Sequence, residues 1–176
     1  GVDTILGPEM RSTGEVMGVG ASFGEAYFKA QLGAGERLST TGKVFLAVRD
    51  EDKPLIVKTA QNFQALGYGV CATRGTAEYL KEHGIIVQAV NKVQEGRPHI
   101  VDAIKNGEIA LVVNTVGSTV QSVTDSHSIR RTSLTQRVPQ YTTIAGGEAM
   151  SEGAKSREHL GVYSVQELHG RLKNKA

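Results

Sequence analysis

The sequence has few of the residues on which several classes of protein depend. Its 176 residues contain one cysteine, no tryptophan and only 5% aromatic residues. The single thiol, Cys71, excludes an internal disulfide and a cysteine-rich metal site, and it fits a reducing compartment. We therefore expect a cytoplasmic protein. The scarcity of aromatic side chains also argues against stacking platforms for single-stranded nucleic acid.

Charge and targeting signals are equally sparse. The formal net charge is only +2, from 20 Lys and Arg against 18 Asp and Glu, and no polybasic run occurs, so we expect no nucleic-acid partner. The five histidines are scattered without metal-ligand spacing, which predicts no metal site. We expect no membrane segment and no secretory signal. The start at Gly1 rather than Met is typical of a mid-sequence segment, so we expect a piece of a longer protein.

What the sequence does contain is a regular alternation of apolar runs and helical patterns. Predicted strands cover 44–48, 68–72, 85–90, 109–113 and 141–144. One predicted helix begins at 52–54, and four others cover 77–83, 100–104, 126–136 and 165–173. This alternation predicts an α/β fold of three layers, a Rossmann-like parallel sheet with right-handed crossovers. Before it, a helical patch at 23–32 and Gly33-Ala34-Gly35 are typical of a preceding segment and linker, which places a boundary near residue 40.

The most specific local feature is the tetrapeptide Thr73-Arg74-Gly75-Thr76, between a predicted strand and a predicted helix. Two hydroxyls, a glycine that permits a tight turn and the N–H groups of a helix start are what an anion site needs. We interpret this segment as a phosphate cradle. For Thr76 alone, a simple N-cap role is an open alternative.

Other polar residues follow the predicted strands at the same edge of the sheet, where ligands bind in open α/β sheets. They are Arg49, Lys53, Asn91, Lys92, Asn114, Thr115, Gly117 and Ser118. Cations and N–H donors hold phosphate, and amides suit ribose or base, so the set predicts a site for a phosphorylated ligand. Solvated loops are the alternative. Asp125 is interpreted either as an acceptor for ribose or base or as the N-cap of the next helix. Cys71 is interpreted as a buried structural thiol, with a nucleophile as the less favoured alternative because no histidine lies nearby in the sequence.

Two groups of segments resemble one known family. LGPEMRSTGEVMGVG at 6–20 resembles the end of the second synthetase (ATP-grasp) half of carbamoyl phosphate synthase large chains. ATRGTA at 72–77, NKVQEGRPHIVDAIKNGEI at 91–109, Asn114-Thr115 and IRRT at 129–132 resemble the regulatory domain that follows it, whose fold is called methylglyoxal synthase-like. The resemblance implies that residues 1–40 are the tail of the synthetase half and a linker, and that residues 41–176 are the allosteric domain.

The resemblance also implies a function. The parent enzyme of this family makes carbamoyl phosphate for pyrimidine and arginine synthesis. It uses bicarbonate, ammonia from a small glutamine amidotransferase chain, and ATP with Mg or Mn. This part of the chain would be regulatory, without catalytic residues or a cofactor of its own. It would bind UMP as inhibitor or IMP at one site, contribute to an ornithine site shared with the synthetase half, and form homo-oligomers.

The resemblance also implies roles for individual residues that match the family's pattern. Lys53, Thr73, Gly75, Thr76 and Lys92 match the family's phosphate side, Asn114 and Thr115 its ribose-side loop, Asp125 its nucleoside end, and Thr142 an ornithine contact. The sequence departs from the family pattern at Ala47 and Val116, where hydroxyls are expected, and at Gln140, where a tyrosine is expected. These departures put the strength and choice of ligand in doubt.

Two alternative functions stay open at this point. A methylglyoxal synthase-type phospho-lyase shares the fold, but it needs a carboxylate base beside the cradle, and the residue before ATRGTA is Cys71. An oligomerisation module with a degenerate effector site is the other alternative. The replacements Ala47 and Val116 favour it.

Overall fold

The sheet is built from five parallel strands in the order β3-β2-β1-β4-β5. The computed structural model describes residues 14–117 and 120–173. The strands are β1 (Lys43–Ala47), β2 (Gly69–Ala72), β3 (Val87–Ala89), β4 (Ile109–Asn114) and β5 (Gln140–Tyr141). The predicted α/β fold with a parallel sheet is confirmed. The fifth strand also exists, although it ends at Tyr141 rather than at Ile144.

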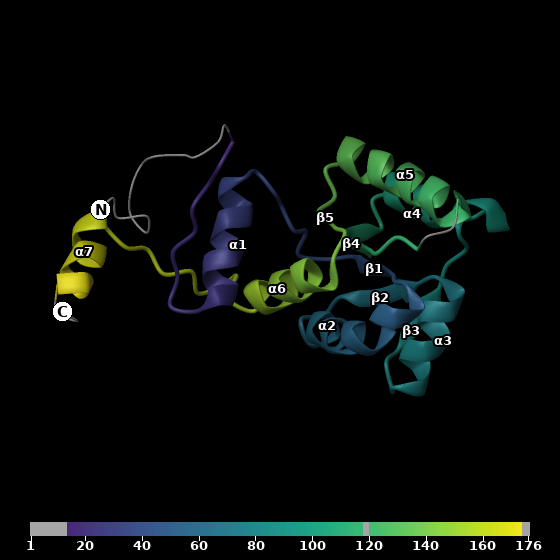
Figure 1. The fold of residues 1–176 in the computed structure, drawn as a ribbon, viewed down its shortest axis with the longest axis horizontal. Coiled ribbons are helices and arrows are strands. Elements are labelled where there is room, and N and C mark those ends of the chain that lie inside the picture. The colour runs from purple at the N-terminus through teal and green to yellow at the C-terminus, as the bar shows by residue number, and fades with distance from the viewer. Residues whose placement is uncertain (1–13, 118–119, 174–176) are drawn as a thin grey trace.

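Seven helices and two short 3₁₀ turns connect and cover the strands within the described residues (Figure 1). The helices are α1 (Phe23–Gly33), α2 (Lys53–Ala65), α3 (Arg74–Glu82), α4 (Ile100–Lys105), α5 (Val120–Thr135), α6 (Ile144–Ala154) and α7 (Val165–Lys173), and the turns are η1 (Asp50–Asp52) and η2 (Val93–Glu95). None of these helices has the length and apolar character needed to cross a membrane, as far as the described residues go.

The strand side chains alternate between two apolar cores, one on each face of the sheet. Val44 and Leu46 pack in a core with residues of α1, α2, α3 and α6, whereas Phe45 packs on the other face with α4 and α5. In β4, Leu111 and Val112 divide in the same way. Because both faces of the central strands are covered, these strands are almost wholly apolar, as expected for a parallel sheet between two helical layers.

Two helices begin earlier than the sequence pattern predicts. Helix α3 begins at Arg74, so the cradle is the cap and first turn of the helix rather than a loop before it. Helix α5 begins at Val120, which places Asp125 inside the helix and makes its interpretation as an N-cap wrong. Apolar periodicity reports the buried part of a helix, and the first turn of α3, Arg74-Gly75-Thr76, is polar, which explains its earlier start.

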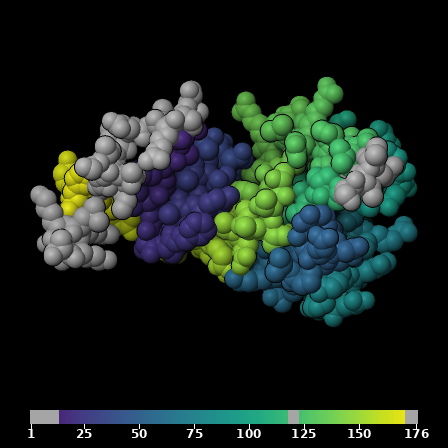
Figure 2. All heavy atoms as spheres, in the orientation of Figure 1, coloured from purple at the N-terminus to yellow at the C-terminus, as the bar shows by residue number. Residues whose placement is uncertain are grey.

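Helix α6 was not predicted, because its sequence IAGGEAMSEGA contains three glycines, which are poor helix formers. The glycines permit close packing instead. A Cβ added at Gly147 would lie 2.8 Å from Val113 Cγ2, and one at Gly153 would lie 2.6 Å from the carbonyl oxygen of Gly24 on α1. Figure 2 shows the atoms of α1 directly against those of α6.

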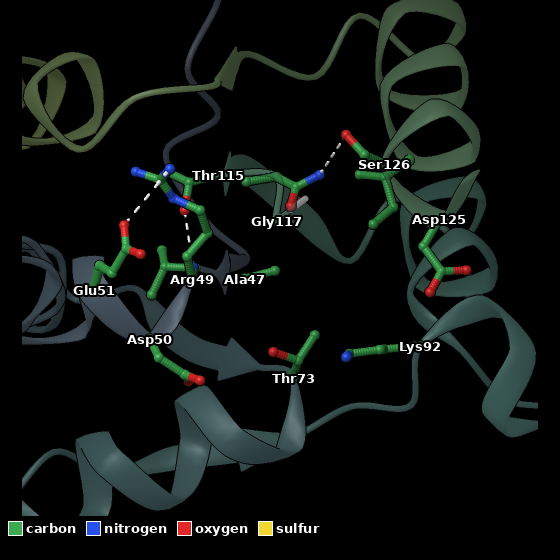
Figure 3. Close-up of a pocket in the computed structure, with 13 residues that line it drawn as sticks. Ala47, Arg49, Asp50, Glu51, Thr73, Lys92, Thr115, Gly117, Asp125 and Ser126 are labelled. Carbon is green, nitrogen blue, oxygen red and sulfur yellow. Dashed lines mark hydrogen bonds and ion pairs between the residues drawn. The ribbon is translucent and has the colours of Figure 1, made fainter. Parts of the chain in front are cut away.

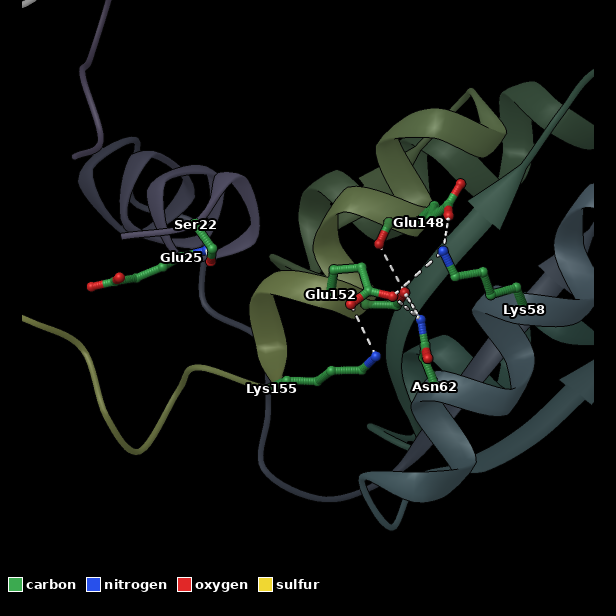
Figure 4. Close-up of polar contacts among 8 residues, drawn as sticks. Ser22, Glu25, Lys58, Asn62, Glu148, Glu152 and Lys155 are labelled. Carbon is green, nitrogen blue, oxygen red and sulfur yellow. Dashed lines mark hydrogen bonds and ion pairs between the residues drawn. The ribbon is translucent and has the colours of Figure 1, made fainter. Parts of the chain in front are cut away.

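A polar network joins α2 to the exposed side of α6 (Figure 4). Lys58 Nζ lies 2.7 Å from Glu148 Oε1 and 3.8 Å from Glu152 Oε1, and Asn62 Nδ2 donates to Glu152 Oε1 over 2.8 Å. Lys155 Nζ lies 2.9 Å from the other Glu152 oxygen. These contacts lower the pKa of Glu152, the hydrogen bond from Lys155 contributing most. The network fixes how α6 lies along α2.

Glu25 connects the start of α1 to the chain that follows α6. Its carboxylate accepts hydrogen bonds from the backbone N–H groups of Ala21 at 2.7 Å and Gly161 at 2.9 Å, and it pairs with Lys29 Nζ at 2.8 Å. The hydrogen bond from Lys29 and the two backbone donors lower the pKa of Glu25 to about 2. Helix α1 is thus held to the rest of the structure. The boundary expected near residue 40 stays a prediction.

Candidate functional site

A pocket of about 520 Å³ opens at the carboxyl ends of β1, β2 and β4 (Figure 3). Its lining residues are Ala47, Val48, Arg49, Asp50, Glu51, Thr73, Lys92, Asn114, Thr115, Gly117, Asp125, Ser126 and Ile129. The volume lies within the range of about 300–1,000 Å³ typical of small-molecule sites. Seven of the predicted site residues line this pocket: Arg49, Thr73, Lys92, Asn114, Thr115, Gly117 and Asp125.

The cradle forms one wall of the pocket. Thr73 is the N-cap of α3, with extended backbone and no capping hydrogen bond from its side chain. The simple N-cap role considered for Thr76 is therefore wrong. Thr76 is buried, and its hydroxyl lies 3.3 Å from the Thr73 hydroxyl and 3.4 Å from the backbone nitrogen of Val48, which donates to it. Thr76 thus fixes the chain after β1 against the cradle, while Thr73 faces the pocket.

Lys53 lies against Gly75 of the cradle. A Cβ added at Gly75 would lie 3.4 Å from Lys53 Nζ, so the missing side chain leaves room for the ammonium group against the first turn of α3. Lys53 Nζ also pairs with Asp50 Oδ1 at 2.7 Å. Among the described residues, Lys53, Gly75 and Thr76 are not part of the pocket lining.

Lys92 supplies a cation from the opposite side. It precedes η2, and Figure 3 shows its amine directed toward Thr73 across the pocket. Its backbone N–H donates to Glu95 Oε2 at 2.8 Å, which fixes the turn that carries it. A lysine on one side and a helix N-terminus on the other are the arrangement that holds a phosphate group.

The end of β4 supplies an amide and a hydroxyl. Asn114 Nδ2 donates to Ser126 Oγ on α5 at 3.1 Å, and Thr115 Oγ1 accepts from the backbone N–H of Arg49 at 3.0 Å. Asp125 is buried on α5 and lines the same side of the pocket. These groups suit the hydroxyls of a ribose or the polar edge of a base. Ser118, also predicted at this end of β4, lies outside the described residues.

Two carboxylates in the pocket lining were not predicted. Asp50 and Glu51 follow β1 in η1, and both line the pocket. The rule that located the other residues, a search just after each strand, would have found them. The hydrogen bond from Lys53 lowers the pKa of Asp50, with a further contribution from the charge of Lys92. The site therefore combines cations with anions.

A second hollow of about 390 Å³ adjoins the pocket and shares Arg49 and Thr115 with it. It contains Thr142, the residue predicted on the ornithine side, so Thr142 lies in this neighbouring hollow. Between the two hollows, the Arg49 guanidinium binds both oxygens of Asp52 at 2.9 and 3.2 Å. Hydrogen bonding to Arg49, assisted by Thr115, lowers the pKa of Asp52.

Cys71 takes no part in this pocket. Its side chain is buried in the core on the α4 and α5 face, and burial raises the pKa of the thiol to about 12. At neutral pH the group is therefore a thiol and a poor nucleophile, which agrees with the structural interpretation. In the described part of the chain, no group of three or more His, Cys, Asp or Glu side chains is arranged to hold a metal ion.

Comparison with known proteins agrees with this fold. The family model described as MGS-like domain matches residues 55–142, a range that includes the cradle and the ends of β2 and β4. The chain belongs to the MGS-like domain family. A carbamoyl phosphate synthase large chain from Neisseria meningitidis serogroup A is 81% identical over all 176 residues. The large chains of Pasteurella multocida and Pseudomonas putida are 60% and 54% identical over 98% of this chain.

These relatives show which version of the MGS-like domain is present. It is the version found in carbamoyl phosphate synthase large chains, because the similarity extends over the whole chain and not only over the domain. The chain spans about 16% of the length of these relatives. The segment at 6–20, which carries part of the resemblance, lies partly outside the described residues.

Proposed function

We propose that this MGS-like domain is an allosteric module that binds a nucleoside monophosphate. The observation that carries the proposal is the convergence of the α3 N-terminus, Thr73, Lys92 and Asn114 on one pocket of about 520 Å³. The pocket combines the N-terminus of a nine-residue helix with a facing lysine. The pairing of these two features favours a phosphate group.

In the proposed complex, the phosphate lies at the first turn of α3, between Lys92 and Lys53. The first N–H groups of a helix have no partner within the helix, and the helix dipole favours an anion at that end. The Thr73 hydroxyl makes no capping bond and lies 3.3 Å from the Thr76 hydroxyl, so on binding it can turn to donate to a phosphate oxygen instead. Asn114 and Asp125 then lie on the side where ribose and base would extend. UMP and IMP are the ligands that the family resemblance indicates.

The proposed role in the parent enzyme is regulation. The parent would be an ATP-dependent ligase that forms carbamoyl phosphate in the cytoplasm together with an amidotransferase chain. Nucleotide binding would favour one arrangement of domain and synthetase half, and so change substrate affinity through a coupling free energy. Thr142 would contribute to an ornithine site at that border. The shared wall formed by Arg49 and Thr115 supports communication between the two hollows.

The phospho-lyase alternative needs a general base, and the carboxylates of the pocket give it a specific observation. A general base is most effective when its pKa lies near the operating pH. The hydrogen bond from Lys53 lowers the pKa of Asp50, away from neutral pH. We therefore favour binding over catalysis. Release of methylglyoxal from dihydroxyacetone phosphate would reverse this preference.

Calorimetric titration of the chain with UMP and IMP tests the proposal. Binding without turnover is expected, and Lys92→Met should weaken it roughly 10- to 100-fold, since it removes a charge-assisted hydrogen bond. Lys81→Met is the matched control, because Lys81 is exposed on α3 away from the lining. No heat of binding with either nucleotide, for a folded sample, would contradict the proposed function.

A further inference from the structure

Asp50 occupies an unusual position for a residue at an anion site. It lies in the 3₁₀ turn after β1, lines the pocket, and pairs with Lys53 at 2.7 Å, although the carboxylate itself is 93% exposed. An acidic side chain in the lining repels an incoming phosphate. The placement of Asp50 therefore opposes the proposed ligand rather than helping to bind it.

The Asp50 carboxylate binds the ammonium group that a phosphate at the start of α3 would bind. Lys53 Nζ lies against Gly75 in the first turn of α3, beside the free end of that helix, and it is only 18% exposed. A phosphate at the helix N-terminus would be the natural partner for this ammonium group. In the structure its partner is the Asp50 carboxylate instead. Figure 3 shows that this carboxylate enters from the same side of the pocket as Thr73.

Lys92 faces the same region. Its charge acts on Asp50 as well, from the opposite side of the pocket. Both lysines proposed to hold a phosphate thus lie within electrostatic reach of one carboxylate. In water-exposed surroundings such a pair is weak, so a dianionic phosphate ester can displace the carboxylate, whereas an uncharged ligand gains nothing by doing so.

We infer that Asp50 is a built-in counter-ion that competes with the phosphate of the ligand for Lys53, so that it lowers the affinity for phosphorylated ligands and leaves the affinity for neutral ligands unchanged. The inference rests on the proposed function, because it assumes that a phosphate enters this pocket. Because the Asp50 side chain is 93% exposed, it can rotate outward into solvent when the ligand binds. Breaking the Asp50–Lys53 ion pair therefore reduces the net free energy of ligand binding.

Asp50→Asn tests the inference, because it removes the charge and keeps the shape of the side chain. We expect UMP to bind about two- to tenfold more tightly to this variant, from loss of an exposed ion pair and of repulsion. Glu78→Gln is the matched control: it removes one negative charge from an exposed position on α3 outside the lining, and should change affinity less than about twofold. Uridine, which has no phosphate, should not bind more tightly to Asp50→Asn than to the unaltered chain.

Each result of the calorimetric titrations decides a different point. If the unaltered chain binds UMP and Asp50→Asn binds it equally or more weakly, the counter-ion role is refuted and the proposed function stands. If only Asp50→Asn binds UMP, the counter-ion role is supported, and UMP binding by the unaltered chain is refuted. If neither binds, both the inference and the proposed function fail. If uridine gains as much as UMP, Asp50 acts on the nucleoside and the inference is again refuted.

Discussion

The contact between α1 and α6 depends on a glycine, and replacing it should loosen the structure. Gly153 lies where the two helices cross, and a Cβ added there would be 2.6 Å from the Gly24 carbonyl oxygen and 2.9 Å from Phe28 Cβ. The first of these atoms belongs to the backbone of α1, so it cannot move aside as the end of a flexible side chain would. Gly153→Ala must therefore push α1 away from α6.

The expected size of the effect follows from two opposing contributions. Overpacking in a well-packed region costs about 1–3 kcal/mol, and a 2.6 Å approach to backbone lies at the upper end of that range. Alanine in place of glycine within a helix stabilises the helix by about 1 kcal/mol. The net loss should be about 2 kcal/mol. For a chain of this size, that lowers the melting temperature by about 4–8 °C.

Thermal and urea unfolding followed by circular dichroism measure this change. Gly170→Ala is the matched control, because Gly170 lies in helix α7 with no heavy atom within 4 Å of an added Cβ. It should stabilise or leave the melting temperature unchanged. The UMP affinity of folded Gly153→Ala should be preserved, since the pocket lining includes no residue of α1 or α6. A Gly153→Ala variant as stable as the unaltered chain would refute the close packing described here.

Three further predictions follow from the site and its surroundings. Cys71, whose thiol pKa is raised to about 12 by burial, should react with iodoacetamide at pH 8 only after unfolding in urea, as followed by mass spectrometry; prompt labelling of the folded chain would contradict its burial. Glu25, whose pKa is lowered from 4.5 to about 2 chiefly by Lys29, stabilises the fold above pH 4.5 and loses this effect as the pH falls toward 2. The stability difference between the unaltered chain and Glu25→Gln in urea titrations should therefore shrink over that range, and a constant difference would show that the charge is not involved. Thr115→Val should cost about 1 kcal/mol in urea unfolding, because it removes the acceptor of the part-buried hydrogen bond from the Arg49 backbone N–H, and an unchanged midpoint would count against this hydrogen bond.

The sheet and most of its helices could be predicted because their burial leaves a pattern in the sequence. The run 109–113 is apolar on both faces, and α2 shows a first-turn proline and an apolar stripe at Ile56, Ala60 and Phe63. Helix α6 could not be predicted in the same way. Its glycines are typical of turns in a sequence. The structure shows that they are needed because the backbone of α1 and the side chain of Val113 approach them too closely for a Cβ.

The sequence predicts at which edge of the sheet the site lies, but it does not predict which side chains contact one another there. The rule that ligands bind at the carboxyl ends of strands located Thr73, Lys92 and Asn114. That Thr76 faces Val48 rather than the pocket depends on where α3 begins, and the polar first turn concealed that boundary. The pairing of Lys53 with Asp50 is a choice among several nearby charges, which side-chain geometry decides.

The central claim is that a phosphate group binds at the first turn of α3, and a nuclear magnetic resonance titration with UMP tests it most directly. The account predicts that the backbone amide resonances of Arg74, Gly75 and Thr76 shift most, together with the Asn114 side-chain amide, and that uridine leaves the first three unchanged. Saturable shifts confined to other parts of the chain, or the same shifts with uridine as with UMP, would contradict it.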